Sequence, residues 1–270
     1  MHKRKDNYKI TIYFLLAIIV IQAIFLIASC QRRTRKLPAQ KEKEIAQPEI
    51  IQGRIAVVLD DWGYNLRNIK ALEEIKEPLT LAILPNLNYS SEIAQKAAEL
   101  KKEVILHLPL EPYREEHYHL EKNTIFTAMP KAEVIKILRA DFNSVPGLKG
   151  ASNHMGSKAT EDESLMRIIF TELKKRKLYF LDSFTSKTIC KGLAYSLGLP
   201  YAQRHVFLDN NNDYDRILAQ FETLARLAKR QGFAVGIGHA RTRTLEALVK
   251  VIPDFKKRGF KFVFVSELVK

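Results

Sequence analysis

The sequence contains little cysteine: only Cys30 and Cys190 occur in 270 residues. Cys30 closes a long apolar run near the N-terminus, and it lies in a membrane or carries a lipid if that run is an export signal. Cys190 then has no partner, which excludes a structural disulfide even in an exported chain. We interpret Cys190, between a Thr/Ser-rich segment and an expected helix, as a small packed residue rather than a nucleophile.

Several motifs are also missing, and each absence excludes a class of protein. No Gly-rich phosphate loop follows the first expected strand, as a dinucleotide-binding fold would require. Zinc-finger spacings, RNA-binding aromatic motifs and Lys/Arg-rich recognition helices are not found, so we expect no nucleic-acid partner. No internal repeat or low-complexity tract stands out.

Acidic residues are outnumbered, 30 against 44 basic ones, and the net charge is +14. Residues 1–49 hold 10 basic and 4 acidic residues, which leaves 34 and 26, a net charge of +8, in residues 50–270. The basic character is therefore not confined to the N-terminal region. A basic domain suits anionic surroundings such as a membrane or a cell wall.

Residues 10–30 contain no charged residue. At about 1.5 Å per residue, such a helix crosses the roughly 30 Å hydrocarbon core of a bilayer. Basic residues precede it, as on the cytoplasmic side of an export signal. Two alternatives stay open: an uncleaved anchor, or a lipoprotein signal cleaved before a lipidated Cys30. Both attach the chain to the membrane through residues 1–30 and place the remainder in the periplasm or another extracytoplasmic space.

Residues 31–52 are polar and contain Pro38 and Pro48, which is typical of a linker. Residues 53–270 then alternate between β-branched runs and amphipathic stretches, which predicts parallel β–α units. Strands are expected at 54–59, 79–84, 103–108, 148–153, 177–182, 233–238 and 261–265, with a weaker one at 199–203. Helices are expected at 90–102, 163–177 and 215–231, the second with a capping box formed by Thr160 and Glu163. This pattern predicts an α/β fold, a distorted (β/α)7–8 barrel, with an open doubly wound sheet as the alternative.

Polar residues follow almost every expected strand. In a parallel barrel the carboxyl ends of the strands meet at one mouth, so these side chains are expected to share a site. They are Asp60, Asp61, His107, Asn153, His154, Asp182, Asp209 and His239. Adjacent carboxylates such as Asp60 and Asp61 repel each other unless a positive group lies close by. Mixed Asp/His sets bind zinc and related divalent ions, so we expect a metal site, with Zn²⁺ as the favoured ion.

Six motifs, in this order, resemble the divergent polysaccharide deacetylase family: LDDWGYN, ILHLPLEP, NHMGS, FLDS, RHVFLDN and IGHARTRT. That family is an exported branch of the carbohydrate esterase superfamily, related to nodulation-type deacetylases. The resemblance covers residues 53–268 and implies a distorted (β/α) barrel with metal-dependent N- or O-deacetylase ancestry. It also implies that Asp60 is the catalytic base and Asp61 a metal ligand.

The chain departs from the superfamily pattern at several positions. The usual His-x3-His pair and the Arg-x-Pro-Tyr motif are absent, His205 stands where an acid is expected, and Ala240 stands where proline is commoner. A second histidine ligand must therefore come from another strand, and His154 is the candidate.

We expect Asp61, His107 and His154 to bind the metal, with His239 as general acid and Asp182 orienting a histidine. Trp62, Glu111, Asn153 and Asp209 are expected to bind the substrate, an acetylated envelope polysaccharide or peptidoglycan. Simpler roles stay open: Asp182 or Asp209 can cap a helix, and Glu111 can merely line the mouth. His117 and His119 are expected in a solvated loop.

Two other function classes are compatible with the sequence. A glycoside hydrolase uses two carboxylates across a sugar bond, but side chains of adjacent strand residues alternate in direction, so Asp60 and Asp61 would face each other poorly. A non-catalytic envelope protein could bind glycan or a protein partner through an inherited pocket.

Overall fold

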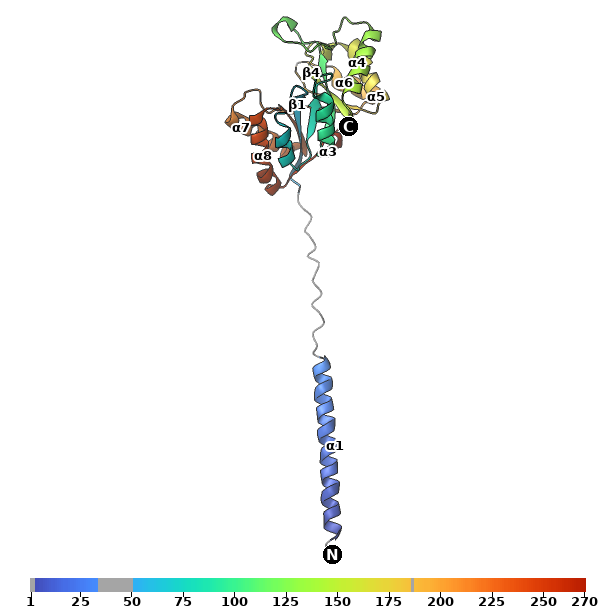
Figure 1. The fold of residues 1–270 in the computed structure, drawn as a ribbon, viewed down its shortest axis with the longest axis vertical. Helices are drawn as coiled ribbons and strands as arrows, with labels where there is room; N and C mark the ends of the chain where they lie inside the picture. The colour runs from blue at the N-terminus through green and yellow to red at the C-terminus, as the bar shows by residue number, and fades with distance from the viewer. Residues whose placement is uncertain (1–2, 34–50, 186) are drawn as a thin grey trace. The chain divides into compact units, whose positions relative to one another are not determined.

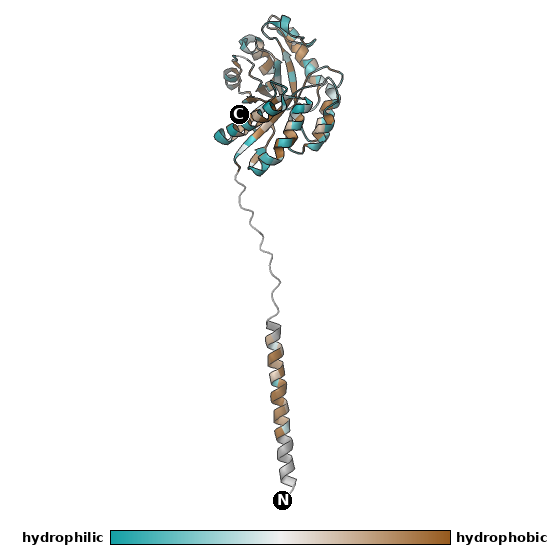
Figure 2. Ribbon diagram, turned by 90° about the vertical axis from the view of Figure 1, so that its left-hand side faces the viewer, coloured by the Kyte–Doolittle hydropathy of each residue, from teal (hydrophilic) through white to brown (hydrophobic). Residues whose placement is uncertain are grey.

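The computed structural model describes residues 3–33, 51–185 and 187–270. The chain divides into two compact units, residues 1–48 and 49–270. The first contains helix α1 (Lys3–Arg33), which extends three residues into the expected linker (Figure 1). Residues 34–50, most of that linker, lie outside the described part. Within α1, the segment Ile12–Cys30 is long and apolar enough to cross a membrane, and its ribbon is mostly brown, the colour of hydrophobic residues, in Figure 2.

The second unit is built on one sheet, in which every pairing between the described strands is parallel. Its strands are β1 (Gly53–Trp62), β2 (Thr80–Ile83), β3 (Glu103–Leu110), β4 (Gly150–Met155), β5 (Tyr179–Asp182), β6 (Tyr201–Gln203), β7 (Val206–Phe207), β8 (Phe233–His239) and β9 (Phe260–Phe262). All eight expected strands are present, and the short β7 is one that the sequence pattern did not predict.

The strand order is β6-β5-β4-β3-β2-β1-β8-β7, with β9 paired to β1. This order follows the chain around a circle that is open between β6 and β7. A doubly wound sheet would instead reverse its order partway across. The fold is therefore a curled, incompletely closed barrel, as the sequence predicted.

The helices pack on the outside of the curled sheet. They are α2 (Ile69–Glu74), α3 (Ser90–Glu99), α4 (Lys131–Ser144), α5 (Glu163–Lys175), α6 (Cys190–Leu197), α7 (Tyr214–Gln231) and α8 (Thr242–Lys257), with short 3-10 turns at Glu115–His117, Ala159–Glu161 and Val265–Glu267. Figure 1 shows α7 and α8 on one side of this unit and α4, α5 and α6 on the other.

Side-chain alternation along each strand separates two apolar layers. On β1, Ile55, Val57 and Leu59 pack toward the helices. Ala56 and Val58 point into the barrel, where they meet a smaller cluster. Any residue that shares the inward direction at a strand's carboxyl end therefore points into the barrel mouth.

The expected capping box at α5 is wrong. Asp162 is the N-cap, and its side chain accepts a hydrogen bond from the Leu165 N–H. The Thr160 hydroxyl instead donates to the Gly156 carbonyl at 2.8 Å. An aspartate directly before the helix satisfies the N3 amide itself, so threonine is not needed there.

Candidate metal centre

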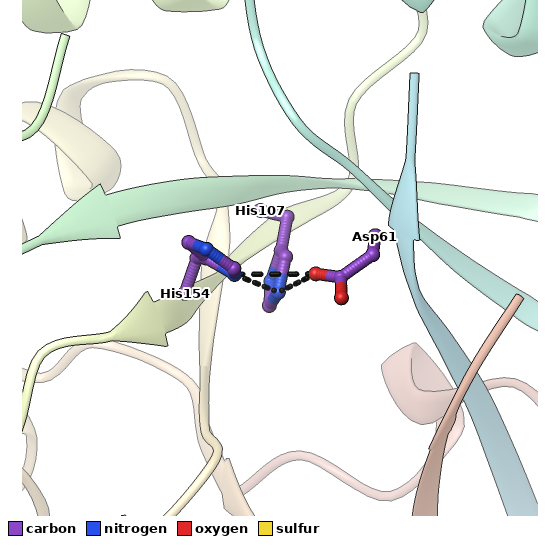
Figure 3. A group of neighbouring side chains, drawn as sticks. All are labelled: Asp61, His107 and His154. Carbon is purple, nitrogen blue, oxygen red and sulfur yellow. Dashed lines mark hydrogen bonds and ion pairs between the residues drawn. The ribbon is translucent and has the colours of Figure 1, made fainter. Parts of the chain in front are cut away.

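Three side chains from three strands of the sheet meet at the barrel mouth: Asp61 from β1, His107 from β3 and His154 from β4 (Figure 3). Asp61 Oδ1 lies 3.3 Å from His107 Nε2 and 3.2 Å from His154 Nδ1. The two ring nitrogens are 3.2 Å apart. The structure thus brings together the three residues that the sequence predicted as metal ligands.

This triangle fits a divalent cation. Ligand atoms held at about 2.1 Å from a tetrahedral ion lie about 3.4 Å from one another, close to the distances between these three atoms. Asp61 Oδ1 is buried and makes no hydrogen bond of acceptable geometry within the described residues. The three ligand atoms converge on one point, and one of them is a carboxylate oxygen without a hydrogen bond. A bound cation would interact with all three.

A β-bulge places the Asp61 carboxylate in the site. The register of β1 against β2 shifts between Leu59 and Trp62, and Asp61 has a left-handed backbone with φ of 64°. A bulge inserts one extra residue and re-aims its side chain. Asp60, which points into the barrel, and Asp61 both reach His107: Asp60 Oδ2 is 3.6 Å from His107 Nε2. Strict alternation would have turned them apart.

The electrostatics differ sharply between the two aspartates. Burial and the charges of Asp61 and Asp209 raise the pKa of Asp60 well above its ordinary value. Burial also acts to raise the pKa of Asp61, but the ring nitrogens of His107 and His154 outweigh it and hold that pKa well below the usual range. Asp61 is therefore the permanent anion of the pair, while Asp60 is the carboxyl group that a nearby cation would help to ionise.

His107 is prepared as a neutral ligand. Burial lowers its pKa to about 4, so the ring is uncharged at neutral pH. Its Nδ1 lies 2.9 Å from the hydroxyl of Ser152 on β4. A proton on Nδ1 leaves the Nε2 lone pair facing Asp61 and His154. The sequence analysis missed Ser152, although its position two residues before His154 puts both side chains on the same face of the strand.

His239, at the end of β8, is held by Asp209. Its Nδ1 is 2.8 Å from Asp209 Oδ1, and its backbone N–H donates to Asp209 Oδ2 at 2.8 Å. The Thr244 hydroxyl donates to the same oxygen at 2.6 Å. His239 Nε2 then faces the centre, 3.6 Å from Asp61 Oδ2.

The expected role of Asp182 as a histidine partner is wrong, because Asp209 occupies that role. Asp182 accepts hydrogen bonds from Thr188, Tyr201 and the Phe184 N–H, none of them from a described histidine. On β5, Tyr179 and Leu181 point into the barrel, so Asp182 shares the helix-facing direction of Phe180. Burial raises the pKa of Asp182.

The four residues expected to bind substrate are all buried, and the structure gives each another set of partners. Asp209 is 0% exposed and holds His239. Trp62 lies in the core between sheet and helices, because the bulge returns it to the helix side.

The other two residues hold loops together. The Asn153 side chain accepts a hydrogen bond from the Ser183 N–H and donates one to the Met155 carbonyl. Glu111 pairs with Lys158 at 2.5 Å and accepts from Thr127. Direct contact with a substrate stays a prediction for all four residues, whose observed contacts are with neighbouring protein groups.

Two interpretations of isolated residues agree with the structure. Cys190 is buried, and burial raises its thiol pKa to about 12, as suits a packed residue rather than a nucleophile. His117 and His119 lie on an exposed loop after β3.

The curled parallel barrel with Asp and His side chains converging at its mouth is the deacetylase type of fold. The family model of divergent polysaccharide deacetylases matches residues 57–269, and the chain belongs to that family. The uncharacterized protein YibQ of Escherichia coli K12 is 34% identical over 204 residues, which cover 75% of this chain and 63% of that protein. The chain thus spans less than two thirds of that relative's length.

Solved structures agree on the fold. The uncharacterized protein ATU2773 of Agrobacterium tumefaciens is 26% identical with a TM-score of 0.77, and the match covers 80% of this chain and 89% of that one. A mutant of the CE4 family pseudoenzyme BA3943 of Bacillus anthracis, with restored enzymatic activity, has a TM-score of 0.54 at 14% identity, covering 82% and 68% of the two chains. At that identity the likeness concerns the fold alone.

Proposed function

We propose that this chain is an exported, metal-dependent hydrolase that removes acetyl groups from a cell-envelope polysaccharide or peptidoglycan. The observation that carries the proposal is the triangle of Asp61, His107 and His154, whose donor atoms lie 3.2 to 3.3 Å apart beside a second carboxylate. Membership of the deacetylase family supports the reaction class. The apolar helix α1 supports attachment of the catalytic unit to a membrane.

The chain's own residues divide the work. Asp61, His107 and His154 would hold a divalent ion, most simply Zn²⁺, which when bound polarises an acetyl carbonyl and makes water more acidic. Asp60, beside His107, accepts a proton from the attacking water. His239, in its imidazolium form with the Nδ1–H held by Asp209, delivers the proton on Nε2 to the leaving amine or alkoxide.

A glycoside hydrolase is less well supported. Its two carboxylates must stand about 5 Å or more apart on opposite sides of a sugar bond. Asp60 and Asp61 instead converge on the same His107 nitrogen, at 3.6 and 3.3 Å.

The experiment is a Zn²⁺ titration of the chelator-treated full chain in detergent, followed by an assay of acetate release from N-acetylated glycans. We expect one ion per chain, and a loss of affinity of at least about tenfold in His154→Ala. His117→Ala, on the exposed loop, is the matched control and should bind like the native chain.

Asp60→Asn should keep the ion and lose acetate release, because it removes the base and leaves the three ligands. A chain that takes up no Zn²⁺ would refute the proposal. A chain that binds the ion but releases no acetate would be a non-catalytic binding protein.

A further inference from the structure

Three arginines gather on the loops beside His239, and we name them the arginine platform: Arg67, Arg241 and Arg243. With Asn65, Asn68 and Asn212 they line an open pocket of about 440 Å³. The pocket lining contains no aspartate or glutamate. Arg67 comes from the loop after β1, and the other two come from the start of α8, so residues far apart in the chain converge here.

The platform is held in place by hydrogen bonds between its loops. The Asn68 amide donates to the Ala240 carbonyl at 2.6 Å and accepts from the Thr242 hydroxyl at 3.3 Å. The Arg241 guanidinium donates to the Asp209 carbonyl at 3.2 Å. The Arg243 guanidinium donates to the Asn212 carbonyl. The loops are thereby fixed to the residue that orients His239.

The guanidinium group of Arg67 is left without a partner. It makes no hydrogen bond or ion pair with any of the described residues, although its backbone N–H donates to Asn65 Oδ1 at 3.0 Å. Arg67 and Arg243 are both exposed. A group of guanidinium ions with no carboxylate among them raises the local positive potential, and each fork matches two oxygens of a carboxylate or phosphate.

A second pocket, formed mainly by the loops after β2 and β3, has a different character. Its volume is about 350 Å³, and its lining includes Asn86, Asn88, Glu121 and Lys122, a mixed set of amides and both charges. Of these two pockets, the one beside His239 is therefore the one that attracts anions.

We propose that the arginine platform binds an anionic group, a carboxylate or phosphate, on the polysaccharide that the metal centre deacetylates. This inference rests on the proposed function for the identity of the ligand as a substrate. Arg241 and Arg243 follow His239 closely in the chain, and the Ala240 N–H between them and His239 donates to the Asp60 carbonyl at 3.0 Å. A glycan held there by its acidic group would place a neighbouring acetylated sugar over the centre.

The test measures binding rather than turnover, by calorimetry on the full chain in detergent. The probes are a hexasaccharide of alternating N-acetylglucosamine and glucuronate and a neutral hexasaccharide of N-acetylglucosamine. We expect the carboxylated probe to bind at least about tenfold more tightly at low salt, with the difference shrinking as salt screens the charges. The double variant Arg67→Gln/Arg243→Gln should lose at least about tenfold of that affinity.

Arg230→Gln is the matched charge control, since Arg230 is exposed near the end of α7, where β8 begins and far from the mouth. It should bind both probes like the native chain. Equal affinity for the two probes, or an equal loss in Arg230→Gln, would overturn the inference. Thermal unfolding of each variant verifies that it is folded.

Competition at constant ionic strength distinguishes the two anion chemistries. Stronger displacement of the carboxylated probe by inorganic phosphate than by acetate assigns a phosphate site, and the reverse assigns a carboxylate site. Displacement by neither beyond that caused by chloride counts against a site. Acetate release from the neutral probe tests the proposed function separately. A chain that binds the carboxylated probe more tightly but releases no acetate refutes the proposed deacetylase activity and leaves the anion site standing.

Discussion

Asp209 has the most completely satisfied carboxylate of the site. Burial acts to raise its pKa, but hydrogen bonds from the His239 ring, the Thr244 hydroxyl and the His239 N–H outweigh burial and lower it. An ionised Asp209 accepts the Nδ1 proton and leaves His239 Nε2 to face the centre. This one residue therefore decides which ring nitrogen of His239 can act on a substrate.

Asp209→Asn should slow acetate release by about 100-fold or more, because an uncharged amide no longer stabilises the imidazolium form of His239 that donates the Nε2 proton. Zn²⁺ affinity should hardly change, since Asp209 contacts none of the three ligands. Asp182→Asn is the matched control: it alters a buried aspartate that contacts Thr188 and Tyr201, so folded protein should retain its rate. Equal slowing of both variants, measured as kcat/KM per folded chain, would contradict the assignment.

A second residue, Asp141 on α4, controls stability rather than chemistry. It is fully buried, its Oδ2 has no described partner, and its Oδ1 accepts from the Asn86 amide at 2.6 Å. Burial, only partly opposed by the Asn86 and Asn123 amides, raises its pKa to about 7. The unfolded chain releases this proton near pH 4, so the folded chain loses stability as the pH rises from about 4 through about 7.

Asp141→Asn should abolish this loss, because the amide stays neutral at every pH. At about 1.4 kcal/mol per pKa unit, the variant should gain up to about 4 kcal/mol relative to the native chain between pH 4 and pH 8. Urea unfolding at a series of pH values measures the difference. If the two chains keep a constant difference across that range, Asp141 does not titrate as stated.

At the scale of single elements, strand ends and helix ends decide how the side chains are aimed. Non-glycine residues with left-handed backbones occur at or beside three of the strand ends that surround the site: Asp61, Met155 and Phe184, with φ of 64°, 55° and 51°. Such a residue turns the chain sharply out of the strand. Helix α5 begins next to this region and is fixed by Asp162.

Asp162→Ala should lower the free energy of unfolding by about 1 kcal/mol, because the Leu165 N–H loses its acceptor at the helix start. Glu163→Gln serves as control: its carboxylate lies on the exposed surface, paired only with Arg167, and its loss should cost less than about 0.5 kcal/mol. Chemical denaturation measures the free energy of unfolding of both variants. A larger loss in Glu163→Gln than in Asp162→Ala would show that Glu163, and not Asp162, caps the helix.

At the scale of the whole molecule, the second unit has its own core. Both apolar clusters found among the described residues are made of residues 55–268. The inner cluster is completed by Val263, Val265 and Leu268, so the C-terminal segment is part of the barrel.

A fragment of residues 49–270 should therefore fold without the first unit and unfold at the same temperature as the full chain in detergent. Only the full chain should sediment with lipid vesicles, because α1 carries the apolar segment. A fragment that melts more than a few degrees lower would show that the first unit stabilises the second.

The fold and the grouping of Asp and His residues could be predicted from the sequence because strand runs, helix periodicity and ordered motifs are local signals. The parallel arrangement gathers strand ends at one mouth, so Asp61, His107 and His154 are expected near one another. The choice of Asp61 over Asp60 as the metal ligand comes from the family resemblance. The remaining roles could not be assigned in that way. Asp182 and Asp209 both lie at or just after strand ends, and only the inward or outward direction of the strand residues separates their roles.

The sequence by itself determined the alternation of strands and helices, the apolar N-terminal segment and the set of residues at the mouth, since each depends on neighbours in the chain. Only the tertiary structure decided which aspartate holds His239, that Trp62 is buried, and that Arg67 joins Arg241 and Arg243. A one-residue bulge in β1 reverses the alternation after Asp60, and contacts between distant loops bring the arginines together. Both depend on packing across the barrel, which spacing along the chain does not encode.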